Sequence, residues 1–246
     1  DDHGFFTPDS FLDWPSKAYP EIARNGIRAV LLWAMEAAAK MNRQLGYDAL
    51  AAQCDGVCEL IKKTRHGAAH LKQVAAMLIL RYLHDESCAE LLSQNGAEGF
   101  STFMSYFLLS AVAAYGEYES ALTMLKEYYG GMLQMGATTF WEDFDLAWAK
   151  NAAPLDRMPK EGERDIHGDF GAYCYRGLRH SLCHGWASGP CPFLTRHVLG
   201  VQALEAGMRR VRIRPCLGNL TFAEGTVPTP HGVITVSHTR GEDGKV

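Results

Sequence analysis

Apolar side chains recur every three or four positions along most of the chain up to about residue 199, which is the period of amphipathic helices. The pattern predicts six helices, over about 21–45, 50–61, 71–82, 87–95, 100–115 and 118–135. Two shorter helices are expected around 172–185 and 190–199. Between the sixth helix and these, the polar residues 145–172 are typical of a long ordered loop, a kind of segment that often carries function.

The pattern changes after Gly200. Val211 and Ile213 alternate with arginines, and Ile234 and Val236 alternate with polar residues after a turn at 229–232. A period of two predicts β-strands. We therefore expect a mainly α fold with short strands at its C-terminal end, divided into a helical domain, 1–203, and the start of a β-domain, 204–246.

Composition narrows the function classes. The 246 residues carry a formal net charge of -4, which does not favour binding to nucleic acid or to anionic lipid. No apolar run is long enough to span a membrane. The seven cysteines favour free thiols that pack as small hydrophobes over a disulfide framework. Neither a dinucleotide-binding glycine motif nor a P-loop occurs, so we expect no cofactor.

Two stretches combine the residue types that carbohydrate chemistry needs. Glu142 ends the stretch 136–142 directly after Trp141, and His184 and Trp186 lie in the stretch 179–190. A carboxylate can transfer protons or activate water, an aromatic ring can stack on a sugar, and a histidine can hold hydroxyl groups. The alternative for Glu142 is a capping or surface carboxylate.

Other polar residues near these stretches have two interpretations. They could complete a site, or they could be caps and Asx turns of the loop; they are Asp143, Asp145, Asp165, His167 and Asp169. His180 and His184 are four apart on a predicted helix, so both could face one side. Because residue 181 is not Glu and no CxxC pair occurs, we predict no metal site.

Four stretches, in order, resemble the C-terminal half of family 78 α-L-rhamnosidases, and 11–14 resembles a further piece of the catalytic domain. The four are 136–142, 180–190, 198–201 and 229–232. The resemblance implies a partial (α/α)6 six-hairpin barrel followed by the first strands of a C-terminal β-sandwich. It also implies inverting hydrolysis of terminal, non-reducing α-L-rhamnose, with a rhamnose-containing glycan as the partner.

The resemblance also implies roles for residues. Glu142 matches the general base, and His184 matches a histidine that contacts the sugar. Trp14 matches an aromatic residue of the rhamnose subsite, and Asp13 precedes it. With Trp141 and Trp186, these residues form the expected substrate-binding set.

The chain departs from the family in ways that suggest alternatives. The acidic motif that holds the general acid is missing, and fewer than twelve helices are predicted. We therefore expect a C-terminal portion whose exposed apolar helix faces bind either the preceding part of the same protein or a second copy. Two alternative functions follow: a sugar-binding scaffold without catalysis, or a six-hairpin enzyme that acts on another polysaccharide. The resemblance fits a bacterial enzyme in the periplasm, outside the cell or in the cytoplasm.

Overall fold

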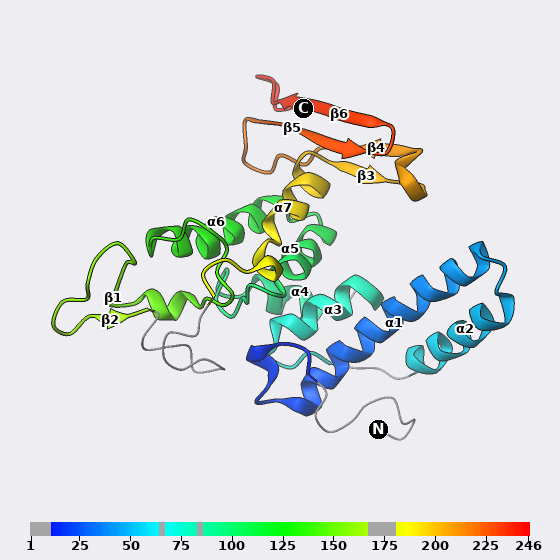
Figure 1. The fold of residues 1–246 in the computed structure, drawn as a ribbon, viewed down its shortest axis with the longest axis horizontal. Coiled ribbons are helices and arrows are strands. Elements are labelled where there is room, and N and C mark those ends of the chain that lie inside the picture. The colour runs from blue at the N-terminus through cyan, green and yellow to red at the C-terminus, as the bar shows by residue number, and fades with distance from the viewer. Residues whose placement is uncertain (1–10, 64–66, 83–85, 167–180) are drawn as a thin grey trace. The chain divides into compact units, whose positions relative to one another are not determined.

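The computed structural model describes residues 11–63, 67–82, 86–166 and 181–246 (Figure 1). Helices dominate the first two hundred residues, and short strands follow, as the sequence predicts. The chain forms two compact units, Asp1–Gln94 and Asn95–Val246. The division into domains at residues 203 and 204 stays a prediction.

The first unit is helical. After a short 3-10 helix, Trp14–Ser16, it contains α1 (Pro20–Gln44), α2 (Asp48–Lys62), α3 (Lys72–Tyr82) and α4 (Glu86–Ser93). Gly46 has a φ of 78° and lets the chain turn from α1 into α2. Leu32 of α1 packs against Cys58 and Ile61 of α2. The four helices predicted for this part of the sequence are confirmed.

The second unit begins with α5 (Ser105–Ala114) and α6 (Tyr118–Gln134). The prediction that α5 begins at Phe100 was wrong, because residues 100–101 are irregular and residues 102–104 form turns. There, the Ser105 hydroxyl donates to the carbonyl of Thr102, and the Thr102 hydroxyl donates to the carbonyl of Glu142. Hydroxyl side chains that bond to backbone groups in this way compete with the first turn of a helix.

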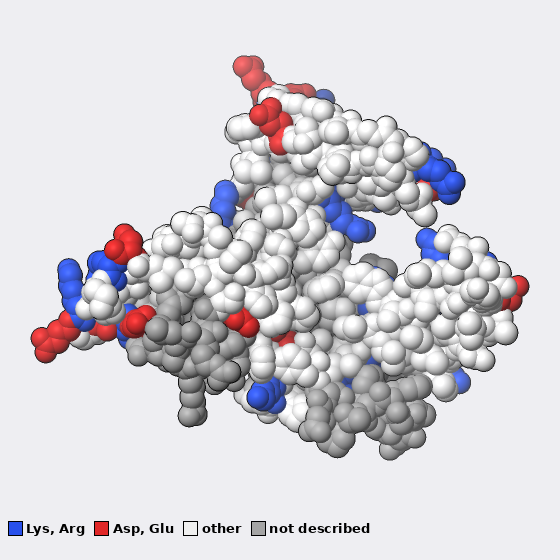
Figure 2. Space-filling model, viewed as in Figure 1, with Lys and Arg blue, Asp and Glu red and all other residues white. Residues whose placement is uncertain are grey.

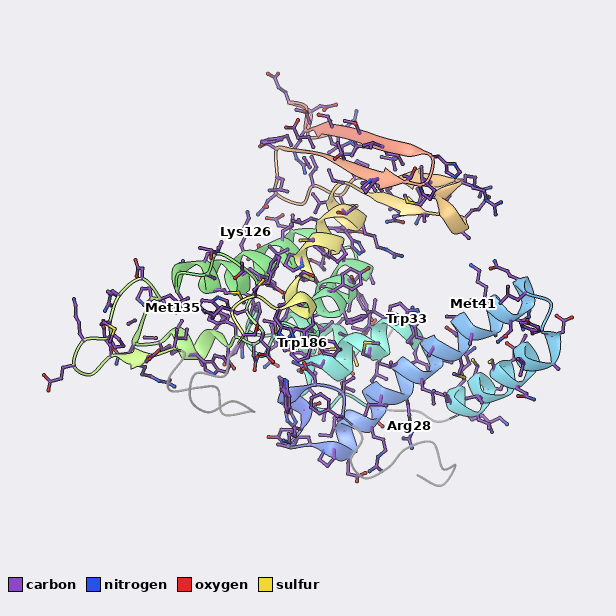
Figure 3. All side chains as sticks on the ribbon, viewed as in Figure 1. Arg28, Trp33, Met41, Lys126, Met135 and Trp186 are labelled. Atoms are coloured by element: carbon purple, nitrogen blue, oxygen red, sulfur yellow. The ribbon has the colours of Figure 1, made fainter. Side chains whose placement is uncertain are left out.

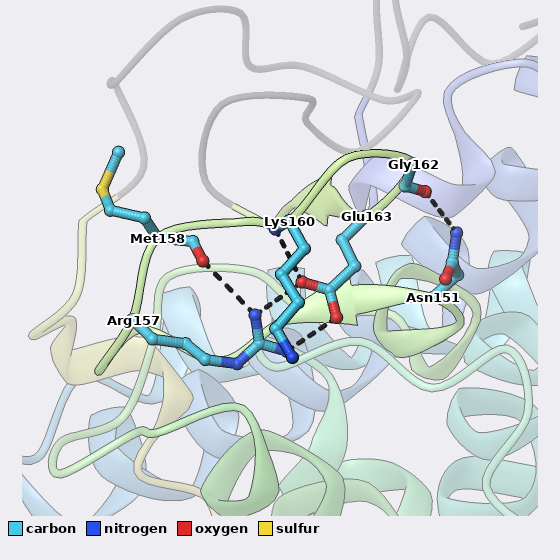
Figure 4. Close-up of polar contacts among 6 residues, drawn as sticks. All are labelled: Asn151, Arg157, Met158, Lys160, Gly162 and Glu163. Carbon is cyan, nitrogen blue, oxygen red and sulfur yellow. Dashed lines mark hydrogen bonds and ion pairs between the residues drawn. The ribbon is translucent and has the colours of Figure 1, made fainter.

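The polar segment after α6 is ordered as far as residue 166, and the rest of the predicted loop lies outside the described residues. The described part holds a 3-10 helix, Leu146–Ala149, and two short parallel strands, β1 (Ala152–Ala153) and β2 (Arg164–Asp165). Between the strands, both carboxylate oxygens of Glu163 accept from the Arg157 guanidinium, at 2.5 and 2.7 Å (Figure 4). That bidentate bond and the backbone N–H of Lys160 hold the pKa of Glu163 at about 2. Side chains of both charges gather over this segment on the face shown in Figure 2.

The strands after residue 200 form two antiparallel pairs. β3 (Val201–Ala203) pairs with β4 (Val211–Ile213), and β5 (Phe222–Thr229) pairs with β6 (Gly232–Thr239). The turn predicted at 229–232 joins β5 to β6. Before β3 lie α7 (Pro190–Phe193) and a π-helix, Leu194–Val198, so the predicted helix over 190–199 is confirmed.

His197 lies on this π-helix among side chains of α5, α6 and α7. Its ring stacks on Phe193 with 4.9 Å between centroids, and it lies 6.2 Å from the Tyr118 ring. Its Nε2 lies 3.5 Å from the hydroxyl of Ser110. Burial, assisted by the charge of Arg196, lowers the pKa of His197 to about 4.

This low pKa predicts that acid destabilises the second unit. The unfolded chain binds a proton at His197 near pH 6.5 and the folded chain near 4, so the stability from the neutral ring is complete above 6.5 and falls as the pH drops toward 4. Because the ring is only partly buried, we expect a loss on the order of 1 kcal/mol between pH 7 and 5. Urea unfolding of the chain and its His197→Gln variant at both pH values measures it. An equal pH dependence of the two proteins would contradict the assignment.

Candidate active site

The stretch that carries Glu142 leaves the end of α6 and runs beside the second predicted stretch. Gly136 has a φ of 91°, and a β-carbon there would lie 3.1 Å from the backbone nitrogen of Leu155. The N–H of Glu142 donates to the carbonyl of Ser181 at 2.9 Å, and the N–H of His184 donates to that of Phe140 at 2.8 Å. These bonds join two stretches that lie about forty residues apart in the sequence.

The predicted helix over 172–185 was wrong in the part that the structure describes. Residues 181–184 are irregular because their backbone groups bond to the 140–142 stretch instead of to one another. His184 precedes a 3-10 helix, Gly185–Ala187. His180 lies outside the described residues, and so do His167 and Asp169.

The Glu142 carboxylate accepts from a backbone donor of the second stretch and lies near a histidine. Its Oε2 accepts from the N–H of Ser181 at 3.0 Å and lies 3.9 Å from Nδ1 of His184. The Glu142 side chain is 13% exposed and that of His184 is 30% exposed, so water can reach both. This geometry suits a carboxylate that must keep one orientation while it exchanges protons with a water molecule.

The backbone carbonyl of Glu142 accepts a hydrogen bond that orients Trp186. It accepts from the indole Nε1 of Trp186 at 2.6 Å, and the buried Thr102 hydroxyl donates to the same oxygen. The centroid of the Trp186 ring lies 4.2 Å from that of His184 (Trp186 is labelled in Figure 3). The structure therefore brings Glu142, His184 and Trp186 together.

Trp141 is buried in the core, directly before Glu142 in the sequence. Its ring is 1% exposed and packs edge-on against Phe144, with 5.9 Å between centroids. Phe144 in turn packs against Tyr128 of α6. This burial favours packing beneath the Glu142 stretch over stacking on a sugar, and the expected contact of Trp141 with substrate stays a prediction.

The neighbouring aspartates have structural contacts. Oδ1 of the buried Asp143 accepts from the N–H of Phe144 at 2.9 Å, and the side chain of Asp145 caps the 3-10 helix by accepting from Ala147 at 2.8 Å. Asp165 is exposed on β2. These contacts favour the interpretation of Asp143 and Asp145 as loop caps.

Asp13 and Trp14 lie in the first compact unit. Asp13 is buried and caps the first 3-10 helix, where its Oδ1 accepts from the N–H of Trp14 at 2.8 Å. The half-buried Trp14 ring packs edge-on against Phe11, and the ammonium of Lys17 lies 5.4 Å from its centroid. Their expected contact with substrate stays a prediction.

Sequence reasoning missed the residues beneath the site. The hydroxyl of Tyr129 donates to the carbonyl of Ala187 at 2.8 Å and lies 2.8 Å from the Ser105 hydroxyl, and burial raises its pKa. A β-carbon at Gly189 would lie 2.4 Å from the Ser105 hydroxyl oxygen, so only glycine fits this close approach of the backbone. In the sequence, Tyr129 occupies an apolar position of the α6 pattern. That pattern predicts its burial but not its hydrogen bonds.

The described residues also bear on metal binding, on the cysteines and on membrane-spanning helices. No group of three or more His, Cys, Asp or Glu side chains there could hold a metal ion. The six described cysteines are reduced thiols; Cys58 and Cys88 are buried as expected, whereas Cys183 and Cys191 are exposed. None of the helices described is both long and apolar enough to cross a lipid bilayer.

Comparisons with known proteins agree with the motifs. Residues 200–246 match the family described as the bacterial alpha-L-rhamnosidase C-terminal domain. The structure is similar to the crystal structure of a GH78 family rhamnosidase of Bacillus sp. GL1, with a TM-score of 0.64 and 23% sequence identity over 93% of this chain. The chain spans about a quarter of the length of that rhamnosidase, 25%. No curated protein matches the sequence.

Two separate findings thus support the family inferred from the sequence. The first concerns the strands after residue 200, and the second concerns the backbone of nearly the whole chain. They confirm the resemblance and the predicted fold class. The chain therefore has a fold similar to that of one part of a GH78 family rhamnosidase, and its residues 200–246 match the C-terminal domain of bacterial α-L-rhamnosidases.

Proposed function

We propose that this chain carries half of the catalytic centre of an inverting α-L-rhamnosidase, with Glu142 as the general base. The observation that supports this proposal is the pairing of the 140–142 stretch with 181–184, which sets the carboxylate 3.9 Å from Nδ1 of His184 and beside the exposed Trp186. A fixed carboxylate, a histidine and an accessible aromatic ring are the groups that a glycosidase uses on its sugar.

In this mechanism Glu142 removes a proton from the water that attacks the anomeric carbon. The N–H of Ser181 holds Oε2 and so orients the carboxylate that accepts from that water. His184 then binds a hydroxyl group of the rhamnose ring. Inversion also needs a general acid about 6.5–9.5 Å from the base, on the side of the leaving group. By the resemblance, we assign that acid to an acidic motif upstream of residues 11–14.

The stereochemistry of the product tests the proposal. The full-length gene product should hydrolyse p-nitrophenyl α-L-rhamnopyranoside, and proton NMR of the first turnovers should show β-L-rhamnose before mutarotation. p-Nitrophenyl α-D-glucopyranoside serves as the control and should not react. Release of the α-anomer first would contradict an inverting mechanism. Rhamnose binding without hydrolysis would instead support a sugar-binding scaffold, and cleavage of another glycan alone would support the alternative substrate.

A further inference from the structure

Two exposed aromatic rings lie in contact beside the Glu142 stretch. Phe103, in the turns before α5, is 39% exposed, and Trp186 is 38% exposed. Their ring centroids are 5.6 Å apart and the planes are tilted by 57°. Contiguous apolar surface that remains exposed next to polar groups is typical of a binding site.

Both rings are attached to the segment that carries the proposed base. Trp186 donates from its indole to the carbonyl of Glu142, and Thr102, the residue before Phe103, donates from its hydroxyl to the same oxygen. The residues on either side of Phe103, Thr102 and Met104, are buried. The backbone that presents the Phe103 ring is therefore anchored, and the ring keeps its place relative to Glu142.

We propose that Phe103 and Trp186 bind the C6 methyl group of the sugar and so select 6-deoxy sugars such as rhamnose. The inference rests on the proposed function and adds a determinant of specificity to it. In an inverting enzyme the base activates water on the face of the sugar opposite the leaving group, so side chains next to the base face the glycone. The aromatic pair is therefore placed to contact the rhamnose ring.

Rhamnose has an apolar methyl group where mannose has a hydroxymethyl group. Transfer of the methyl group from water to the surface of two aromatic rings lowers the free energy. A hydroxyl group in the same place would instead lose its hydrogen bonds to water. The polar side of the sugar has different partners, because His184 contacts both the Trp186 ring and the Glu142 carboxylate. The site thus offers an apolar side and a polar side, as a 6-deoxy sugar does.

Calorimetric titration of the full-length gene product with L-rhamnose and L-mannose tests this inference. We expect the wild-type protein to bind L-rhamnose at least about 10-fold more tightly than L-mannose, the selectivity typical of one small group in an apolar site. Phe103→Ala should bring this ratio to about 2 or less, whereas Phe103→Leu, which stays apolar, should keep most of it. Phe222→Ala is the matched control, because Phe222 is 61% exposed on β5, and its ratio should equal that of the wild type.

The inference is overturned if the wild-type protein binds neither sugar or binds both equally, or if Phe103→Ala keeps the wild-type ratio. Binding is measured without turnover, so the two proposals fail separately. A protein that shows the expected ratios but does not hydrolyse rhamnosides contradicts the proposed function alone. A protein that hydrolyses rhamnosides with inversion but keeps its ratio in Phe103→Ala contradicts this inference alone.

Discussion

Replacing Glu142 by Gln in the full-length gene product should lower kcat for p-nitrophenyl α-L-rhamnopyranoside by at least about 10²-fold, the low end for loss of acid–base catalysis. The amide has nearly the same shape as the carboxylate, and its oxygen can still accept from the N–H of Ser181. It cannot, however, take a proton from water. L-Rhamnose binding, measured by calorimetry, should change little because the contact surface of the site is kept.

Azide provides a second readout of the same variant. Azide is a nucleophile that needs no general base, so it should restore turnover of Glu142→Gln and yield a rhamnosyl azide of inverted configuration. Glu224→Gln, the same substitution at an exposed position on β5, should keep wild-type kcat. An unchanged kcat in Glu142→Gln would remove this residue from the role of base. Loss of rhamnose binding together with kcat would indicate a structural role instead.

Gly200→Ala should destabilise the chain by more than about 4 kcal/mol, a loss that is exceptional for a single substitution and that a steric clash with the backbone can cause. Gly200 has a φ of 74°, and a β-carbon there would lie 2.1 Å from the carbonyl oxygen of Arg214 and 2.5 Å from the nitrogen of Pro215. These atoms cannot give way, because the N–H of Arg214 donates to the carbonyl of Gly200 at 3.0 Å. The clash falls where the π-helix passes into β3.

The Gly207→Ala variant separates the energetic cost of the steric clash from the cost of a positive φ. Gly207 has a similar φ of 69°, but no atom lies within 4 Å of the β-carbon position. That variant should lose only the cost of a left-handed alanine, about 1–2 kcal/mol. Urea unfolding of both variants and the wild type measures the difference in the free energy of unfolding. Equal losses in the two variants would show that the contact with Arg214 has no energetic effect.

The local pattern of the sequence was sufficient for most helices and for the final hairpin. The bounds of α1 and α6 follow the apolar period closely, and β5 and β6 follow the alternation around the turn at 229–232. Glu142, His184 and Trp186, identified from their residue types and spacing, lie together in the structure. Whether Asp13 and Trp14 join them stays a prediction, since they lie in the other compact unit.

The sequence by itself determined which segments form helices and which form strands, because the period of apolar residues is a local property of each segment. Only the tertiary structure decided which face each segment turns inward. Trp141 and Trp186 are the same residue type beside the same carboxylate, yet one is 1% exposed and the other 38%. The difference arises because residues 181–184 bond to the 140–142 stretch instead of forming a helix. Those hydrogen bonds join backbone groups about forty residues apart in the sequence, so a local sequence pattern cannot predict them.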